Sequence, residues 1–491
     1  MRTAYTADQI RAAELALMAT LPEGTLMQRA ASGLAAVCAT LLGRVYGSRV
    51  LLLVGSGDNG GDALYAGERL ARRGARVEAI LAGSKTHAEG LAAFLAAGGR
   101  IADEVGTPDL VVDGLVGIGA SGALREPYAS LVAEANAVDA LVVAVDVPSG
   151  VDSSTGRVAG VAVEAHITVT MGACKTGLLV DPGASRVGAL EVIDIGLGPY
   201  LPDPDVAALT AEDVDSLLPR PGAESDKYRR GVVGIAAGSD RYTGAAVLSV
   251  GGALRAGAGM VRYVGTAPPV QQVRAHWPEA IITELDHPSI GDVGRVQAWV
   301  AGPGLGTGEW AHELLAGVLA TDVPVLLDAD ALTIVARDRG LLRRTAPVLV
   351  TPHAGELGRL LGVPSDRVEA SRLEHARRAA AELGVTVLLK GSTTVIAEED
   401  RPVRVNQTGT SWLATGGTGD VLSGIAGALL AAGLTAYDAG ACAAFLHGLA
   451  GRLAADGAPL TAADVAAAVP AAIRSLSGSL GGDSRSAARR S

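Results

Sequence analysis

Residues 50–65, VLLLVGSGDNGGDALY, decide the fold of the first part of the chain. A run of aliphatic residues, 50–54, leads directly into a glycine-rich turn, and the residues after the turn have the pattern of a helix. A strand that passes through a tight glycine turn into a helix is the opening unit of a doubly wound α/β fold. Further short aliphatic runs follow, separated by alanine-rich stretches, and they predict a parallel sheet covered by helices on both faces. These runs lie at residues 76–82, 110–113, 141–147, 166–170 and 190–195.

The same alternation restarts after residues 196–231, a stretch with several prolines and mixed charges that we interpret as a linker with a short helix. The strands expected after it lie at residues 231–238, 259–264, 298–302, 323–328, 347–351, 385–390 and 402–406. We therefore predict two α/β domains, residues 1–210 and 211–476. We expect the tail, 477–491, to be disordered because it has no apolar period.

Helix ends are marked at several places. Thr6 with Gln9 and Ser371 with Glu374 have the capping-box pattern, and Gly384 has the position of a helix stop.

Composition excludes several classes of protein. Of the 491 residues, 49% are hydrophobic and 19% are charged, which excludes a chain that is disordered throughout. A net charge of −11 and 3% aromatic residues argue against nucleic acid as a partner. Cys38, Cys174 and Cys442 are far apart and lack zinc spacing, which favours a reducing, cytoplasmic location. We expect no signal peptide and no membrane span, since the apolar stretch 421–437 is short and fits a buried helix better.

The first glycine-rich turn, residues 55–60, fits the G-x-G-x-x-G pattern of dinucleotide-binding folds. Glycines that serve only a tight turn are the simpler alternative. However, Asp58, Asn59 and Asp62 lie in or beside this turn. Two carboxylates repel a pyrophosphate, so the turn is better suited to a cation or to ligand hydroxyl groups.

Carboxylates also follow two other expected strands. Asp113 ends one strand and Asp146 ends the next, with Ser149 shortly after it. The carboxyl ends of parallel strands form the ligand crevice of such sheets, so we expect Asn59, Asp113 and Ser149 to converge as oxygen ligands beside Asp146. Each acid alone has the alternative of an ordinary helix cap. Lys175 is the cation that the pattern places near this edge.

Four motifs, GSGDNGGD, DGLVGIGASG, VDVPSGVDSSTG and GACKTGLL, resemble in order and separation those of the NAD(P)H-hydrate epimerase family. The resemblance implies a Rossmann-like fold and interconversion of the R and S epimers of hydrated nicotinamide cofactors. It implies K⁺ ligands at Asn59, Asp113 and Ser149. The implied substrate contacts are Asp58, Asn59, Gly60, Gly61, Asp62, Gly117, Ile118, Gly119, Ala120, Ser121, Gly122, Ala123 and Asp146. The chain departs from the usual family pattern at Asp58, where Asn is usual, and at Ala63, where Gly is usual.

Epimerisation of such a hydrate requires the carbon–oxygen bond beside the ring nitrogen to open and to form again on the other face. A carboxylate base within hydrogen-bond reach assists this step. Our hypothesis assigns that role to Asp146, with Lys175 supporting it.

Residues 415–434, TGGTGDVLSGIAGALLAAGL, carry the strongest functional signal in the chain. The amides of residues 416–419 lie directly before a helix, where they and the helix dipole stabilise the charge of a phosphoryl group in transfer. Asp420, in the first turn, is placed to take a proton from an attacking hydroxyl. A glycine turn with Asp420 as an ordinary cap is the alternative. The sequence has no Walker A pattern, which disfavours a P-loop enzyme.

Further motifs, AGPGLG, LLDADALT, TPHAGE and KGSTTVI, together with ATGGTGDVLSGI, resemble one branch of the ribokinase-like superfamily, the ADP-dependent NAD(P)H-hydrate dehydratases. The resemblance implies that the hydroxyl of the S hydrate is phosphorylated and that phosphate is then eliminated, with Asp420 as the base. The implied hydrate contacts are Ala245, Gly304, His353 and Asp420, with Ala246 as an alternative to Ala245. The implied nucleotide contacts are Lys390, Gly391, Ser392, Thr393, Thr394 and Gly419. From the residues alone, His353 has a structural role as a second possibility, and ADP cannot be separated from ATP.

Together the two resemblances imply a bifunctional repair enzyme acting on NADH hydrate and NADPH hydrate, with K⁺ in the first domain, Mg²⁺ and ADP in the second, and a homo-oligomeric state. The main rival is a ribokinase-like small-molecule kinase fused to a non-catalytic dinucleotide-binding domain. The extra carboxylate of Asp58 is the feature that favours a binding role without catalysis for the first domain.

Overall fold

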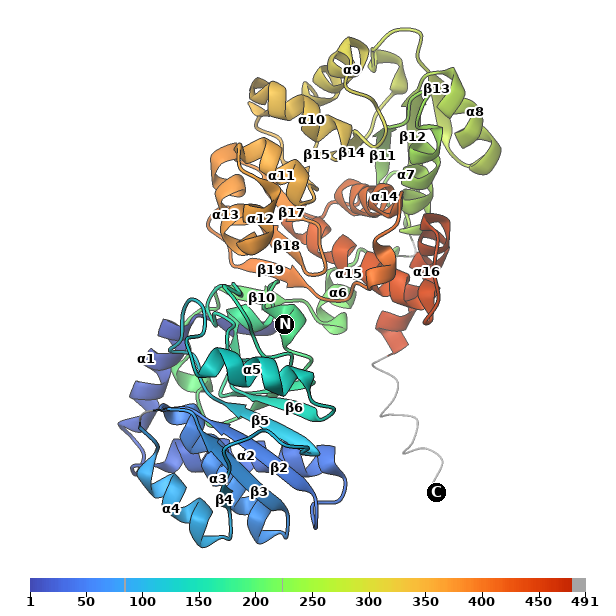
Figure 1. The fold of residues 1–491 in the computed structure, drawn as a ribbon. Helices are drawn as coiled ribbons and strands as arrows, with labels where there is room; N and C mark the ends of the chain where they lie inside the picture. The colour runs from blue at the N-terminus through green and yellow to red at the C-terminus, as the bar shows by residue number, and fades with distance from the viewer. Residues whose placement is uncertain (84, 223, 479–491) are drawn as a thin grey trace, which may run out of the picture. The chain divides into compact units, whose positions relative to one another are not determined.

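The structure is a computed structural model that describes residues 1–83, 85–222 and 224–478, and the chain divides into two compact units (Figure 1). The N-terminal unit contains Thr3–Val206. The C-terminal unit contains Met1–Arg2 and the residues from Ala207 onward. The division lies slightly before the predicted boundary at residue 210.

The N-terminal unit is built on a parallel sheet with the strand order β4-β3-β2-β5-β6-β7-β9. Its strands are β2 (Arg49–Val54), β3 (Arg76–Leu81), β4 (Arg100–Ile101), β5 (Leu110–Gly114), β6 (Leu141–Val145), β7 (Ile167–Met171) and β9 (Ala189–Ile193). The order reverses between β2 and β5, and ligands bind such sheets at this switch point, outside the carboxyl ends of the strands. The predicted doubly wound fold is confirmed here.

Alternating side chains of the central strand β2 face two hydrophobic cores. Leu52 belongs to the core that α2 and α3 share, whereas Leu51 and Leu53 belong to the core beneath α5. The helices are α1 (Ala7–Met18), α2 (Thr25–Leu42), α3 (Asp58–Arg72), α4 (Ala88–Ala96) and α5 (Tyr128–Ala137). Within the described part of the chain, α2 is the one helix with the length and apolar composition of a membrane span, but it contributes Leu34 and Cys38 to the first core.

Two short strands, β1 (Arg2–Tyr5) and β8 (Cys174–Lys175), pair in parallel, with Tyr5 opposite Lys175. β10 (Val206–Ala208) lies at the division between the units.

The C-terminal unit contains a larger sheet whose order is β13-β12-β11-β14-β15-β16-β17-β18-β19. The strands up to β17 pair in parallel, and β18 and β19 add an antiparallel edge. They are β11 (Val232–Ala236), β12 (Met260–Gly265), β13 (Ile281–Glu284), β14 (Ala298–Ala301), β15 (Val325–Leu327), β16 (Val348–Val350), β17 (Thr386–Leu389), β18 (Thr394–Ala397) and β19 (Val403–Asn406). Every strand predicted after residue 231 is found, with ends shifted by a few residues.

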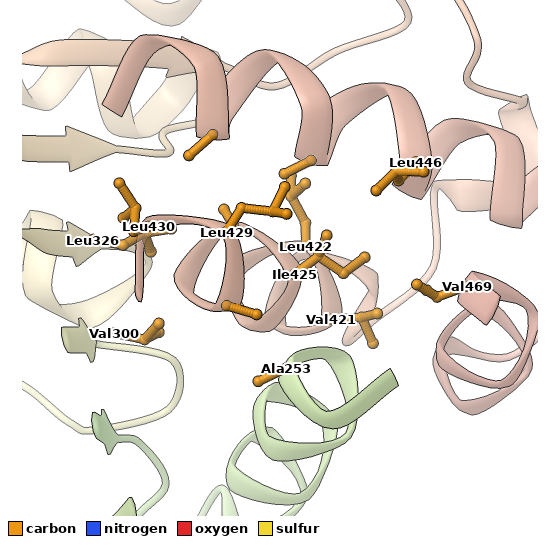
Figure 2. Close-up of a cluster of buried hydrophobic side chains, with 14 of the residues drawn as sticks. Ala253, Val300, Leu326, Val421, Leu422, Ile425, Leu429, Leu430, Leu446 and Val469 are labelled. Carbon is orange, nitrogen blue, oxygen red and sulfur yellow. The ribbon is translucent and has the colours of Figure 1, made fainter. Parts of the chain in front are cut away.

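One helix, α14, lies at the centre of the C-terminal core. Its leucines pack between Val300 and Leu326 of the sheet, Ala253 of α7, and residues of α15 and α16 (Figure 2). The helices of this unit are α6 (Ala211–Leu217), α7 (Thr243–Arg255), α8 (Ala267–His276), α9 (Glu309–Leu319), α10 (Asp330–Arg337), α11 (Ala354–Leu361), α12 (Ser365–Ala370), α13 (Arg372–Leu383), α14 (Thr418–Ala431), α15 (Ala436–Ala455) and α16 (Ala462–Gly478).

Glycines let the backbones of α7 and α14 approach each other closely. A Cβ atom added at Gly252 would lie 2.4 Å from the carbonyl oxygen of Val421, and one added at Gly424 would lie 2.1 Å from that of Ser249. Both distances are shorter than atoms tolerate, so this contact requires glycine in each helix. It fixes the position of α14, and with it the phosphate-binding turn predicted at its start.

Several sequence expectations need correction. Six strands were not predicted, namely β1, β4, β8, β10, β13 and β18. The capping box at Ser371 is wrong, because the N–H of Ser371 donates to the carbonyl of Val368 and closes α12 instead. The apolar stretch 421–437 is buried, but it forms most of α14 and the start of α15, with a turn between them.

Other expectations about helix ends are confirmed. Thr6 and Gln9 form the capping box of α1, and Gly384 ends α13 in a left-handed conformation. Of the predicted tail, α16 extends to Gly478, and residues 479–491 lie outside the described residues.

The cysteines Cys38, Cys174 and Cys442 are all buried and unpaired by disulfides. Burial raises the pKa of the Cys38 and Cys442 thiols to about 12.

Candidate active sites

In the N-terminal unit, a buried ion pair lies at the carboxyl end of β6. Asp146 directly follows this strand with a φ of 66°, and its carboxylate accepts from the ammonium group of Lys175. Lys175 is fully buried and also donates to the hydroxyl of Thr170 (3.0 Å) and to the carbonyl of Met171 (2.8 Å). The structure therefore joins the two residues that the sequence hypothesis paired.

This ion pair lies beside a cleft of about 1680 Å³ that Asp146 lines. The predicted contacts that line it are Asp58, Asn59, Asp62, Gly117, Ile118, Gly119 and Ala120. Gly60 and Gly61 are buried in the first turn of α3 and do not line it, and Ser121, Gly122 and Ala123 are exposed residues beyond its lining. The structure thus brings together eight of the thirteen predicted substrate contacts.

Carboxyl groups crowd the cleft. Burial raises the pKa of Asp62 well above its usual value, and the charges of Asp146 and Asp58 raise it further. The Oδ1 atom of Asp62 is buried and has no hydrogen-bond partner among the described residues. Glu14, from α1, also lines the cleft, and burial raises its pKa while Lys175 opposes the shift. Sequence reasoning missed Glu14, since α1 carries no motif.

The three predicted K⁺ ligands also converge. Ser149 donates its backbone N–H (2.8 Å) and its hydroxyl (2.7 Å) to the carboxylate of Asp113. The amide of Asn59 donates to the carbonyl of Val116 (3.1 Å), and the N–H of Val116 donates to the hydroxyl of Ser149 (3.1 Å). Burial raises the pKa of Asp113 to about 6, although the hydrogen bonds from Ser149 lower it. Asn59, Asp113 and Ser149 therefore form one cluster under the switch point.

In the C-terminal unit, Asp420 lies in the first turn of α14, directly after the predicted glycine turn. Gly417 caps this helix with a φ of 90°, a left-handed conformation that favours glycine. Burial raises the pKa of Asp420 to about 7, the charge of Asp328 raises it further, and Lys390 lowers it. A carboxylate with this pKa is suited to act as a base near neutral pH.

Lys390 lies near the start of α14 and binds a second carboxylate, that of Asp328. Its ammonium group donates to Asp328 (2.7 Å) and lies 3.8 Å from Glu356, and the other oxygen of Asp328 accepts from Ser423 of α14 (2.8 Å). A Cβ atom added at Gly419 would lie 3.5 Å from the Lys390 ammonium, so Lys390 reaches the start of α14. Burial lowers the pKa of Lys390, but Asp328 and Glu356 outweigh burial and raise it.

The predicted hydrate contacts lie on separate turns. Gly304 packs against Ala245, because a Cβ atom at Gly304 would lie 2.8 Å from the Cβ of Ala245. Ala245 is partly exposed, whereas Ala246 is fully buried, which favours Ala245 as a contact. His353 caps α11 through its Nδ1 atom, which accepts from the N–H of Gly355 (3.0 Å). His353 therefore has a structural role as a helix cap, and its ring remains exposed beside Glu356.

The predicted nucleotide contacts Lys390, Gly391, Ser392, Thr393 and Thr394 form one turn between β17 and β18. Three residues near the turn 390–394 and the start of α14 were not predicted: Asp328, Arg372 and His447. His447 is buried, its pKa is lowered to about 4 by burial, and its Nε2 atom lies 2.9 Å from the carbonyl of Thr418. The neutral ring therefore donates to the first turn of α14.

Comparison with known proteins assigns a family model to each of the two units. Residues 23–177 match the family model of the YjeF-related protein N-terminus, and residues 233–470 match that of NAD(P)H-hydrate dehydratase. The bifunctional NAD(P)H-hydrate repair enzyme Nnr of Mycobacterium leprae (strain TN) is 49% identical over 464 residues, covering 93% of this chain and 94% of that protein. This chain belongs to the family of bifunctional NAD(P)H-hydrate repair enzymes.

Solved structures resemble the C-terminal unit of this family member. The ADP/ATP-dependent NAD(P)H-hydrate dehydratase of Bacillus subtilis, co-crystallized with ATP/Mg²⁺, is 33% identical with a TM-score of 0.50, covering 55% of this chain and 99% of that one. A ribokinase-like superfamily protein of Enterococcus faecalis V583 is 26% identical with a TM-score of 0.51, covering 55% and 96%. The predicted ribokinase-like fold of the second half is confirmed.

Proposed function

We propose that this chain repairs hydrated NADH and NADPH in two steps, one in each unit. The N-terminal unit interconverts the R and S hydrates, and the C-terminal unit dehydrates the S hydrate at the expense of ADP. The observation that best supports this proposal is the raised pKa of Asp420, which lies near Lys390 at the start of α14.

In the dehydratase site, the Asp420 carboxylate takes the proton of the hydrate hydroxyl. The hydroxyl oxygen then forms a bond with the terminal phosphorus of ADP while the bond between that phosphorus and the bridging oxygen breaks, which releases AMP. The amides at the start of α14 and the Lys390 ammonium stabilise the charge on the transferred group. The phosphate then leaves the ring carbon as the neighbouring carbon loses a proton to solvent, and the reduced nicotinamide is restored. Ala245, Gly304 and His353 orient the hydrate, and Lys390, Gly391, Ser392, Thr393, Thr394 and Gly419 hold the nucleotide.

In the epimerase site, the carbon–oxygen bond beside the ring nitrogen breaks with the help of the nitrogen lone pair. The hydroxyl takes a proton from solvent in the cleft and leaves as water. A water then adds to the other face of the ring and gives up a proton to Asp146, which returns it to the solvent. Lys175 holds the carboxylate of Asp146 in place through their ion pair. The hydrate contacts are the predicted residues that line the cleft, namely Asp58, Asn59, Asp62, Gly117, Ile118, Gly119, Ala120 and Asp146.

The cluster under the switch point suits a potassium ion. Asp113 is a fully buried carboxyl group whose partners are neutral, namely Ser149 and the N–H of Leu115. K⁺ held by Asn59, Asp113 and Ser149 would supply the positive charge that this carboxylate lacks. Thermal unfolding in KCl and in LiCl of equal strength tests this proposal. Stabilisation by K⁺ that disappears in Asp113→Asn supports it, and equal melting temperatures in both salts contradict it.

Mg²⁺ is proposed as a companion of the nucleotide. Among the residues that the structure describes, no group of three or more His, Cys, Asp or Glu side chains is arranged for a metal ion. Mg²⁺ commonly keeps several waters and is held mainly by phosphate oxygens. We therefore propose that the protein itself contributes little to its coordination. We also propose that the protein is a homo-oligomer in the cytoplasm. Light scattering after gel filtration tests the oligomeric state.

The deciding experiment incubates the full chain with S hydrate and ADP. Recovery of the near-ultraviolet absorbance of reduced nicotinamide, with one AMP and one phosphate released per cofactor, supports the proposal. A stable phosphorylated product formed from ATP instead supports the rival, a small-molecule kinase. For the first unit, Asp420→Asn chains supplied with R hydrate alone report epimerisation without repair. Failure of the R epimer to convert indicates a binding role for this unit.

A further inference from the structure

Arg372, the first residue of α13, occupies an unusual position for a cation. Only 2% of its surface is exposed, and it lies where the positive end of the helix dipole disfavours positive charge. Its Nε atom is buried without a hydrogen-bond partner among the described residues. Both features cost stability, so stability alone does not explain an arginine here.

The guanidinium group of Arg372 binds backbone carbonyls in and beside the turn formed by residues 390–394, which we call the nucleotide turn. Its Nη2 atom donates to the carbonyl of Leu389 (3.3 Å), to that of Lys390 (2.7 Å) and to that of Thr393 (3.2 Å). Its Nη1 atom donates to Glu369 at the end of α12 (2.5 Å). The planar, rigid guanidinium group therefore fixes both ends of the nucleotide turn from its buried side.

Fixing these carbonyls also fixes the amides of the same peptide groups. In a trans peptide the C=O and the N–H point in opposite directions. Because the carbonyl of Lys390 points at Arg372, the N–H of Gly391 points away from it, toward the exposed side of the turn where Gly391 and Ser392 lie. Among the described residues, the N–H of Gly391 has no acceptor.

Gly391 has no room for a side chain on its inner side. A Cβ atom there would lie 2.2 Å from the Nη2 atom of Arg372 and 2.6 Å from the guanidinium carbon. Glycine and arginine at these two positions therefore fit each other. The side chain of Lys390 is held separately, by Asp328 and Glu356.

We propose that Arg372 is a positioning residue for the dehydratase reaction, which presents the N–H of Gly391 to a phosphate oxygen of the nucleotide. This inference rests on the proposed function, because it requires ADP to bind at the turn. Arg372 acts through the backbone and does not itself touch the nucleotide.

The test compares Arg372→Met with wild type in the full chain, measuring dehydration of S hydrate at varied ADP. We expect the KM for ADP to rise about tenfold or more while kcat falls less, since a preorganised binding contact is lost. Arg372→Lys keeps the charge without the fork, so it should recover only part of the affinity. Epimerisation of R hydrate by the same chains reports the N-terminal unit and should not change, and circular dichroism checks that the C-terminal unit is folded.

Two further variants sharpen the test. Arg378→Met removes an exposed arginine from the same helix, where it pairs with Glu382, and should leave the KM unchanged. Gly391→Ala should raise the KM for ADP in the wild-type background but much less in Arg372→Met, because the clashing guanidinium is then absent. Gly409→Ala, whose added Cβ meets its nearest atoms only at 3.8 Å, is the matched control.

The outcomes separate the two proposals. A wild-type chain without ADP-dependent repair defeats the proposed function. A wild-type chain that repairs, together with an Arg372→Met chain of unchanged KM for ADP, overturns the positioning role even if its melting temperature falls.

Discussion

At the scale of single residues, one carboxyl group is central to the chemistry proposed for each site, and the surroundings of the two differ. Asp146 follows the end of β6, whereas Asp420 lies in the first turn of α14. Asp146 is held by the buried ammonium of Lys175, whereas burial and the charge of Asp328 raise the pKa of Asp420 to about 7. A base that is half protonated near neutral pH makes the reaction sensitive to pH.

The dehydration rate should therefore depend on the ionisation of Asp420. Below a pH of about 7 the carboxylate becomes protonated and ceases to be a base, so kcat/KM should fall about tenfold per pH unit in the acid range. Asp420→Asn should lower kcat about 100- to 10,000-fold above neutral pH, and its own rate should lack this acid dependence. Steady-state kinetics across the acid range measures both effects. A wild-type profile that stays flat below neutral pH would contradict the assignment, and epimerisation by Asp420→Asn is the control.

The buried ion pair of the N-terminal unit should dominate local stability. Lys175→Met leaves the carboxylate of Asp146 buried without its cation, and we expect the unfolding free energy of this unit to fall by about 3–5 kcal/mol. Urea unfolding followed by circular dichroism measures it. Lys85→Met removes an exposed lysine of the same unit and should change stability little. Equal losses in the two variants would show that the ion pair is not the cause.

The residues that sequence reasoning found are those that lie in motifs. Asp146, Lys175, Asp420 and Lys390 follow strands or glycine turns and were predicted together. Glu14, Asp328, Arg372 and His447 reach the sites from neighbouring elements through packing, which has no local pattern in the sequence. Ser121, Gly122 and Ala123 share a motif with real lining residues, but the chain turns away from the cleft after Ala120.

At the scale of secondary-structure elements, the contact between α7 and α14 determines where the proposed phosphate-binding turn lies. Gly252→Ala places a methyl group against the carbonyl of Val421, so it should destabilise the C-terminal unit by about 1–3 kcal/mol and lower dehydratase activity by displacing α14. Gly244→Ala, on the same helix but in open space, should be nearly neutral. Thermal unfolding and ADP titrations of both variants measure the difference. Equal effects would mean that the close approach is unimportant.

Elements were predictable where their burial pattern is simple. The central strands are continuous aliphatic runs because both faces of the sheet are covered. β13 was missed because it lies at the sheet edge and its ends are exposed, so its four residues form no such run. The capping box at Ser371 failed because two helices, α12 and α13, meet there, and one N–H cannot serve both.

At the scale of the whole molecule, two units share one chain and one substrate. If each unit works alone, an equal mixture of Asp146→Asn and Asp420→Asn chains should repair R hydrate, although neither variant alone should do so quickly. The product of one chain then diffuses to the other, and the rate should follow the concentration of each intact site. Absorbance of the restored cofactor measures it. Failure of the mixture, with each variant keeping its remaining activity, would show that the steps must occur on one chain.

The buried cysteines of this chain can be used to measure local opening of each unit. Cys38 and Cys174 belong to one unit and Cys442 to the other, and all three are inaccessible while the chain is folded. An alkylating reagent therefore modifies a thiol only when its own unit opens. Mass spectrometry of the modified peptides would time the opening of each half separately, without any engineered label.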